Sequence, residues 1–303
     1  MSTELEEFIE MKKLQKRPLT ESTMKKYIKF YEVLSSHLEG KKICECSEED
    51  LITVIDKFDI GSCGKLNYQN IAIMVKDQHK QETEKLKKYK ELLSAKKDLD
   101  TQYKSIQKLS SLPPYNEVRN YIDSLYEQGD YSNYLVNELI FSYGLRNVDV
   151  NVILATLAQY KQEKKNNLEN YNKQNWLVLK KNSCDLVINR YKTKNSYGSK
   201  NIEVKLKKVL IAGNALGSGW LIQNTKNQPV DDSNVHNYMK LMQYDDYQLR
   251  QSDYFKINLL HIQSQPNSLH KINMLSKSRG SQSLDTLDKH YNMHPKEENQ
   301  EEN

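Results

Sequence analysis

The chain has 303 residues, of which 37% are hydrophobic and 28% are charged, so it can bury a core beneath a very polar surface. The sequence contains no run of about 18 apolar residues, which excludes a membrane-spanning helix. Its charged start, "MSTELEEFIEMKKLQKRP", lacks the apolar core of a secretion signal, so we expect an intracellular protein that is not secreted. The net charge of +5 is compatible with a polyanionic partner.

Four cysteines, at Cys44, Cys46, Cys63 and Cys184, lack the paired spacing of a zinc site. We predict that they are reduced thiols, and we expect neither a bound metal nor a cofactor.

The first hundred residues carry helical patterns. Residues 1–18 are predicted to be a flexible segment, with a short helix ending before Pro18 as the alternative. Apolar residues at steps of three and four follow Thr20, a candidate N-cap, and another helix begins after Ser47. Further helices are predicted at 67–75 and 81–109. Pro113 and Pro114 then mark the domain boundary, so residues 19–110 are expected to form a small helical domain.

The second half changes from helix to strand and back. Three short β-rich runs, "WLVLKKN", "CDLVINRYKT" and "NIEVKL", are separated by turn-forming segments and predict a three-stranded antiparallel sheet. The fold class is therefore mainly α with a small antiparallel sheet (α+β). Helices are predicted at 115–128, 131–143, 233–243, 256–263, 266–278 and 283–291, a polar loop at 161–175, the second domain at 114–293 and an acidic disordered tail at 294–303.

The motif "YGLRNVDV" at 143–150 stands between two predicted helices and the sheet. With "NRYKTKNSYG" at 189–198 and "SRG" shortly before Tyr291, this order of features resembles the tyrosine recombinases, the phage-type integrases and their relatives, over roughly residues 20–293. The resemblance implies that Arg146 is a catalytic arginine, whose planar fork holds two oxygens of one phosphate. Asp149 is expected to orient this arginine or its loop.

The same resemblance implies roles for three further positions. Lys192, with Lys194 in reserve, would donate a proton to the leaving 5′-oxygen from the hairpin between two strands. Arg279 would stand where the family usually has a histidine and would stabilise charge on the transition state. Tyr291 would attack the phosphate and form a covalent phosphotyrosyl bond. The alternatives are a solvated lysine, and a tyrosine packed in the core.

One feature departs from the family pattern, because no H-x-x-R motif precedes the tyrosine. Phe255 or Lys256 occupies the corresponding position, with Arg250 as a substitute from a neighbouring turn. Lys256 would keep the charge without the two-pronged grip of arginine. Losing one preorganised donor costs on the order of 3 kcal/mol of transition-state stabilisation.

The resulting hypothesis is a DNA-cleaving and rejoining enzyme that acts in recombination or integration. Double-stranded DNA would be contacted by cations including Lys25, Lys26 and Lys194, and the family implies a homotetramer assembled on DNA without a metal. The alternatives are a catalytically impaired DNA-binding protein of the same fold and a helical structural or interaction protein. The abundance of Asn, Lys, Ile and Tyr suggests an AT-rich genome, such as that of a mobile element or a virus.

Overall fold

The computed structural model describes residues 3–13, 21–191, 198–266 and 268–279. The chain divides into two compact units, Met1–Lys104 and Ser105–Asn303. The division falls within a long helix, a few residues before the prolines at which the sequence predicts the boundary. Among the described residues, no helix is both long and apolar enough to cross a membrane.

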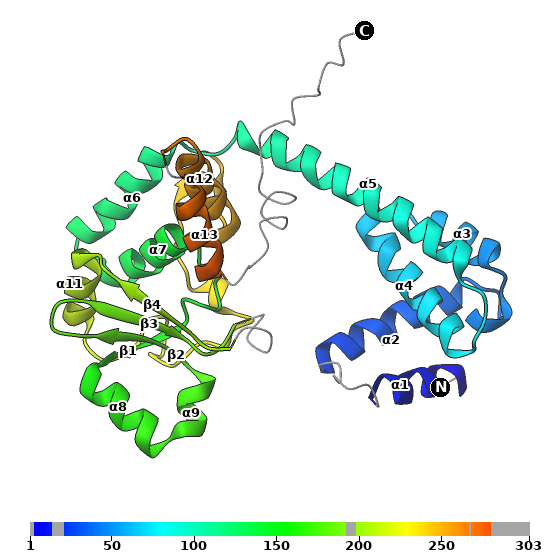
Figure 1. Ribbon diagram of the computed structural model, residues 1–303, viewed down its shortest axis with the longest axis horizontal. Helices are drawn as coiled ribbons and strands as arrows, with labels where there is room; N and C mark the ends of the chain where they lie inside the picture. The colour runs from blue at the N-terminus through cyan, green and yellow to red at the C-terminus, as the bar shows by residue number, and fades with distance from the viewer. Residues whose placement is uncertain (1–2, 14–20, 192–197, 267, 280–303) are drawn as a thin grey trace, which may run out of the picture. The chain divides into compact units, whose positions relative to one another are not determined.

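Unit 1 is helical throughout its described part (Figure 1). Its core contains the fully buried side chains of Leu34, Leu51, Ile71 and Leu86. Its elements are α1 (Thr3–Lys13), α2 (Glu21–Ser36), the short 3₁₀ helix η1 (Ile43–Glu45), α3 (Glu48–Asp56), α4 (Ser62–Gln78) and α5 (Glu84–Leu109), the last of which continues past the division.

Two predictions for unit 1 concern the cap of α3 and the first residues of the chain. Ser47 caps α3, because its side chain accepts a hydrogen bond from the Asp50 amide at 3.1 Å. Over residues 3–13 the start of the chain follows the alternative prediction of a short helix rather than a flexible segment. These residues form α1, which packs on the unit because Leu5 and Phe8 are buried in its core.

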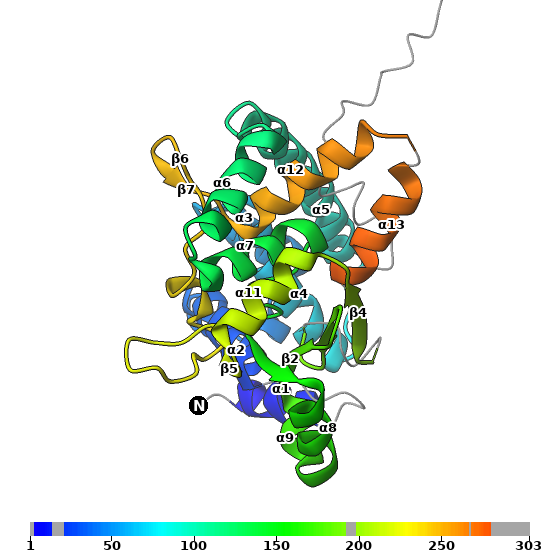
Figure 2. The same ribbon diagram turned by 90° about the vertical axis from the view of Figure 1, so that its left-hand side faces the viewer.

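Unit 2 is built around a sheet whose helices lie on both faces (Figures 1 and 2). The mainly helical fold class with a small sheet is confirmed. The helices are α6 (Tyr115–Glu127), α7 (Tyr131–Tyr143), α8 (Leu157–Asn166), α9 (Leu168–Lys173), α11 (Lys207–Leu216), the 3₁₀ helix η2 (Val235–Asn237), α12 (Gln251–Gln263) and α13 (Ser268–Arg279). The strands are β1 (Val152–Thr156), β2 (Asn175–Leu179), β3 (Cys184–Ile188), β4 (Lys200–Val204) and β5 (Gly219–Trp220), with a separate hairpin of β6 (Gln243–Tyr244) and β7 (Tyr247–Gln248).

The sheet has the order β4-β3-β2-β1-β5. Its β2-β3-β4 part is the antiparallel trio that the sequence predicts. It is nevertheless mixed, because β1 pairs parallel with β2, and α8 and α9 form the crossover that this parallel pairing requires. The predicted polar loop at 161–175 was therefore wrong over most of its length. The predicted helix at 233–243 was wrong as well, since this range contains only the short 3₁₀ helix η2 and the first residue of β6.

Strand β2 is buried along its whole length because both of its faces are covered. Leu177 and Leu179 face the main core, to which α7 and α11 contribute. Trp176 and Val178 face the other way and pack with Tyr171 of α9. Successive side chains of a strand point to opposite faces, so this short strand joins two separate cores.

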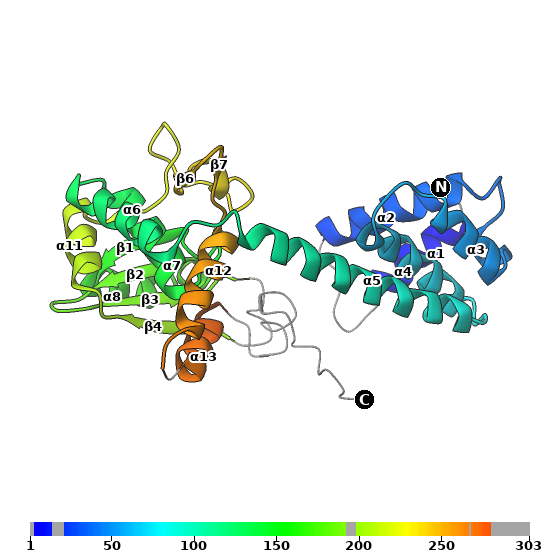
Figure 3. The ribbon, with the colours of Figure 1, turned by 90° about the horizontal axis from the view of Figure 1, so that it is seen from above.

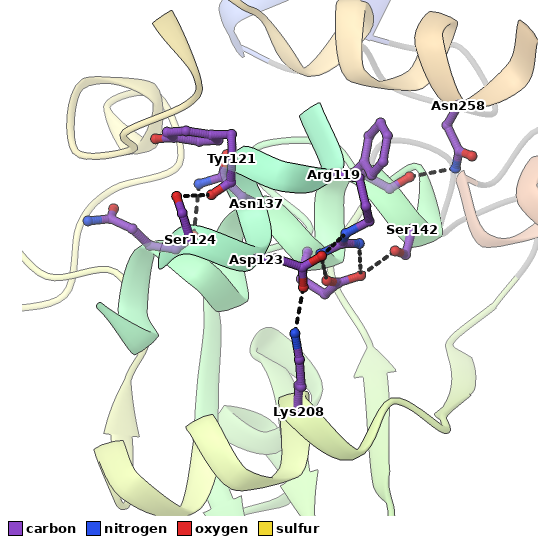
Figure 4. A network of polar contacts seen from close by, with 11 residues as sticks. Arg119, Tyr121, Asp123, Ser124, Asn137, Ser142, Lys208 and Asn258 are labelled. Atoms are coloured by element: carbon purple, nitrogen blue, oxygen red, sulfur yellow. Dashed lines mark hydrogen bonds and ion pairs between the residues drawn. The ribbon is translucent and has the colours of Figure 1, made fainter. Parts of the chain in front are cut away.

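A buried charge network ties α6, α7 and α11 together (Figure 4). Arg119 donates from Nη1 and Nη2 to the two carboxylate oxygens of Glu138 at 3.1 and 2.5 Å, and from Nε to Asp123 at 3.1 Å. Lys208 donates to the other oxygen of Asp123 at 2.7 Å. Because Glu138 is only 2% exposed, loss of this pairing would leave a charge buried without a partner.

Candidate functional site

Arg146 lies in the loop that follows α7, and a glycine sets the course of that loop. Gly144 ends α7 with a φ of 63°, in the left-handed region that favours glycine. A Cβ atom there would lie 2.9 Å from the Phe255 ring and 3.0 Å from Leu275 Cδ1, so the loop packs directly on α12 and α13. The Arg146 amide then donates to Asp149 Oδ2 at 3.0 Å, which closes a turn and positions Arg146.

The side chains of Arg146 and Lys200 both bind the last carbonyl groups of α13. Arg146 Nη1 donates to the Arg279 carbonyl oxygen at 2.6 Å, and Lys200 Nζ donates to the Ser278 carbonyl oxygen at 3.2 Å. Backbone carbonyl oxygens carry partial negative charge, which attracts both cations. Two cations from the α7 loop and from the start of β4 therefore meet at one helix end. Figure 3 shows α13 beside α12 in unit 2.

Lys200 has an altered proton affinity in this position. Burial lowers its pKa to about 8; nearby Asp149 opposes this shift, and nearby Arg146 adds to it. The ammonium also lies 4.1 Å from the centre of the Tyr191 ring. An amine with this pKa is still protonated at neutral pH but releases its proton more readily than an ordinary lysine, which suits general acid catalysis.

Asp149 is the buried carboxylate of this group, with 1% of its surface exposed. Burial raises its pKa, although the amide of Arg146 and the charges of Arg146 and Lys200 act in the opposite direction. Its Oδ1 has no hydrogen-bond partner among the residues that the structure describes. The expected orienting role of Asp149 agrees with its bond to the Arg146 backbone and stays a prediction.

A surface pocket of about 480 Å³ opens beside Arg146. A second arginine, Arg190 at the end of β3, lines the same pocket, as does Asp232, to which Arg190 Nη2 donates at 2.7 Å. The Arg190 Nε atom is buried and has no hydrogen-bond partner in the described part of the chain. Arg146 and Arg190 both line this pocket, and two arginines at one pocket can together bind a tetrahedral oxyanion such as a phosphate.

Arg279 is enclosed within unit 2 and is only 6% exposed. Its guanidinium lies 4.2 Å from the centre of the Phe255 ring, and its Nη1 donates to the Gly144 carbonyl at 3.0 Å. In this arrangement the Arg279 side chain supports the loop that carries Arg146. Its predicted contact with the phosphate remains a prediction and requires the side chain to leave this position.

Position 255, rather than position 256, is the one that contacts Arg279. Phe255 contacts Arg279 with its ring, whereas Lys256 is 8% exposed and lies where the charges of Lys108 and Asp253 act on it. Burial lowers the pKa of Lys256, and Lys108 lowers it further. Lys108 itself is paired with Asp253 at 2.5 Å. The catalytic role predicted for Lys256 stays a prediction.

The remaining predicted residues lie elsewhere. Tyr291, Lys192 and Lys194 lie outside the residues that the structure describes, and Tyr291 follows the last described residue, Arg279, by twelve positions. Lys25 and Lys26 are exposed on α2 of unit 1, and Lys25 pairs with Glu21 at 2.7 Å. Their predicted contact with DNA is untested by this arrangement.

Sequence reasoning did not select Lys200 or Arg190. The segment 190–200 offers several cations on one hairpin, and nothing in their order ranks them. Lys200 follows from the register, because its pairing with Ile188 brings the start of β4 level with the end of β3. The sequence does contain one signal for Arg190, because this arginine stands directly before the "YKT" motif.

Comparison with known proteins gives little further information. No protein-family model matches the chain, and no curated protein matches it. Among solved structures, one similar chain is described as "Crystal structure of XerA recombinase", with 11% sequence identity, 98% of this chain and 95% of that chain covered, and a TM-score of 0.35. A likeness this distant assigns no role to any residue.

Proposed function

We propose that this protein cleaves and rejoins DNA strands through a covalent phosphotyrosyl intermediate, with Tyr291 as the nucleophile. The observation that carries the proposal is the meeting of Arg146 and Lys200 at the end of α13, twelve residues before Tyr291. The chemistry needs a fixed cation for the phosphate and a proton donor for the leaving group, and these side chains have the required properties.

The proposed reaction assigns one task to each group. Arg146 and Arg190 bind the non-bridging oxygens of one DNA phosphate, so Arg190 supplies the second guanidinium that the missing H-x-x-R motif would have supplied. The Tyr291 hydroxyl passes its proton to water as its oxygen attacks phosphorus, a phosphotyrosyl bond forms, and the bond to the 5′-oxygen breaks. Lys200 gives its proton to that oxygen, and the reverse steps rejoin the strand without a nucleotide cofactor. Lys192 remains the alternative proton donor.

Phosphate binding also requires the Arg146 and Lys200 side chains to give up their present hydrogen bonds to α13. The Arg146 side chain donates to the Arg279 carbonyl at 2.6 Å, and Lys200 donates to the carbonyl before it. A DNA phosphate must compete with these two carbonyl groups for the same donors. A full negative charge binds a guanidinium more strongly than a carbonyl does, so the exchange is favourable.

A second candidate is a DNA-binding protein that does not cleave. It is favoured by the apolar Phe255 ring beside Arg279 and by the burial of both Arg279 and Lys256. Such a protein would still lose affinity steeply with salt, because its cations would release counterions from the phosphates.

Trapping separates these candidates. Purified full-length protein is incubated with a library of nicked duplexes that carry a randomised central sequence, and covalent protein–DNA adducts are isolated under denaturing conditions. The proposal expects an adduct that Tyr291→Phe removes and that the control Tyr238→Phe, at an exposed tyrosine, retains. Arg146→Ala and Arg190→Ala are each expected to reduce the rate of adduct formation about 10²–10³-fold. The control Lys207→Ala, at an exposed lysine, is expected to reduce it less than about twofold.

Each other outcome decides against part of the proposal. Salt-dependent binding to the library without any adduct selects the non-cleaving DNA-binding protein. An adduct that survives Tyr291→Phe rejects Tyr291 as the nucleophile, and an unchanged rate in Arg190→Ala rejects Arg190 as the second donor. Absence of DNA binding at low salt rejects both candidates.

A further inference from the structure

A buried carboxylate, a thiol and an imidazole meet in unit 1, far along the chain from the residues discussed above. One ligand atom from each of Glu4, Cys44 and His79 lies within 4.8 Å of the other two. Glu4 belongs to α1, Cys44 to η1, and His79 directly follows α4. Three separate elements therefore present three different metal-ligand types to one point.

We propose that Glu4, Cys44 and His79 bind one Zn²⁺ ion that fastens α1 to the rest of unit 1. A carboxylate, a thiolate and an imidazole nitrogen are all ordinary zinc ligands, and the mixture of a soft sulfur donor with harder donors favours Zn²⁺ over Mg²⁺ or Ca²⁺.

The hydrogen bonds of Glu4 leave room for a metal. Its Oε2 accepts bonds from the Tyr31 hydroxyl at 2.5 Å and from the Ile43 amide at 3.3 Å, which use both lone pairs of that oxygen. Its Oε1 accepts from the Cys44 amide at 2.9 Å, and the Cys44 sulfur lies within 4.8 Å of a carboxylate oxygen of Glu4. Zn²⁺ binding releases the thiol proton to solvent, and the ion can then lie between sulfur and oxygen.

The imidazole provides a second, independent indication. The Nε2 atom of His79 is sealed from solvent, and none of the described residues forms a hydrogen bond with it. An unsatisfied buried polar atom is costly, and coordination would satisfy it. Glu7, one helical turn after Glu4 on α1, places Oε2 4.0 Å from the same nitrogen and is the candidate fourth ligand.

The three ligand atoms need to move only slightly closer together to bind one zinc ion. Ligand atoms bound tetrahedrally at about 2.0–2.3 Å from zinc are roughly 3.4–3.8 Å apart. No separation between the three ligand atoms exceeds 4.8 Å, so side-chain rotations that move these atoms by at most about 1 Å bring them into range. The ligands occur at positions 4, 44 and 79, and this separation explains why no compact sequence motif marks them.

The test uses the full chain, reduced and stripped of metal with a chelator. Zn²⁺ is titrated in competition with a chromophoric chelator, and Co²⁺ is used in parallel because a thiolate ligand produces a charge-transfer band in the near ultraviolet. The proposal expects one tight site per chain, a thiolate–cobalt band, and loss of at least tenfold in affinity in both Cys44→Ser and His79→Gln. The matched controls Cys63→Ser and His37→Gln, at an exposed thiol and an exposed imidazole of the same unit, are expected to bind like the unaltered chain.

Two results would overturn the site. One is the absence of stoichiometric Zn²⁺ binding by the unaltered chain. The other is binding that Cys44→Ser and His79→Gln leave unchanged while their circular dichroism matches that of the unaltered chain. If one variant loses its fold, the other decides, since Cys44 and His79 lie on different elements.

Discussion

Gly144→Ala is the substitution that most directly tests how Arg146 is positioned. The new residue would have to adopt a φ of 63°, which costs a side-chain-bearing residue about 1–2 kcal/mol. Its Cβ would also lie 2.9 Å from the Phe255 ring and 3.0 Å from Leu275, and overpacking of this kind costs about 1–3 kcal/mol. We therefore expect the free energy of unfolding of unit 2 to fall by about 2–5 kcal/mol.

Urea denaturation followed by tryptophan fluorescence measures this change in the correct unit. The chain has 2 tryptophans, Trp176 and Trp220, and both lie in the sheet of unit 2. Gly129→Ala is the matched control, because Gly129 has a φ of 76° but a Cβ there would meet nothing within 4 Å. The control should lose only the backbone part, about 1–2 kcal/mol. Equal losses in both variants would refute close packing of the α7 loop on α12 and α13.

Three further predictions follow from single contacts. Glu138→Gln leaves Arg119 without its buried counter-charge, so the free energy of unfolding should fall by about 3 kcal/mol in the same urea assay. The control Glu127→Gln, at an exposed site, should change it by less than about 0.5 kcal/mol. Ser47→Ala removes the cap of α3 and should cost about 1 kcal/mol, measured as faster hydrogen exchange in that helix; unchanged exchange would contradict the capping bond. The pKa of Lys200 is lowered to about 8, so its acidic form is lost as the pH rises through 8, and adduct formation at subsaturating DNA should decline above that pH. In Lys200→Ala the rate should be low and this decline should vanish; persistence of the decline would exclude Lys200 as the proton donor.

The helices and the central strands were largely predictable because their signals are local. The cap at Ser47, the break at Pro113 and Pro114, and the β-rich runs each act over a few residues. The errors came where local polarity and burial disagree. The segment 161–175 is polar, yet α8 and α9 form there because Tyr160 and Tyr171 pack against Trp176 on the second face of the sheet. The local sequence shows that the segment is polar, but it does not show that its aromatic rings pack on a sheet.

The candidate site was predictable in part. The motif around Arg146 is compact, and its turn with Asp149 spans three residues. The prediction for the hairpin lysine could not extend to Lys200, since its proximity to Arg146 depends on strand register and on α13. The burial of Arg279 against Phe255 was equally hidden, because it joins residues of two helices.

Short-range patterns in the sequence are enough to predict that this chain is mainly helical with a small sheet, and they select Arg146 and Tyr291 as candidate residues. Long-range packing, by contrast, brings Arg146 and Lys200 together at the end of α13, places Arg190 in the pocket beside Arg146, and gathers Glu4, Cys44 and His79. Each of these groups joins segments that are tens of residues apart in the chain. Packing of apolar faces brings these segments together, and local residue spacing does not reveal that packing.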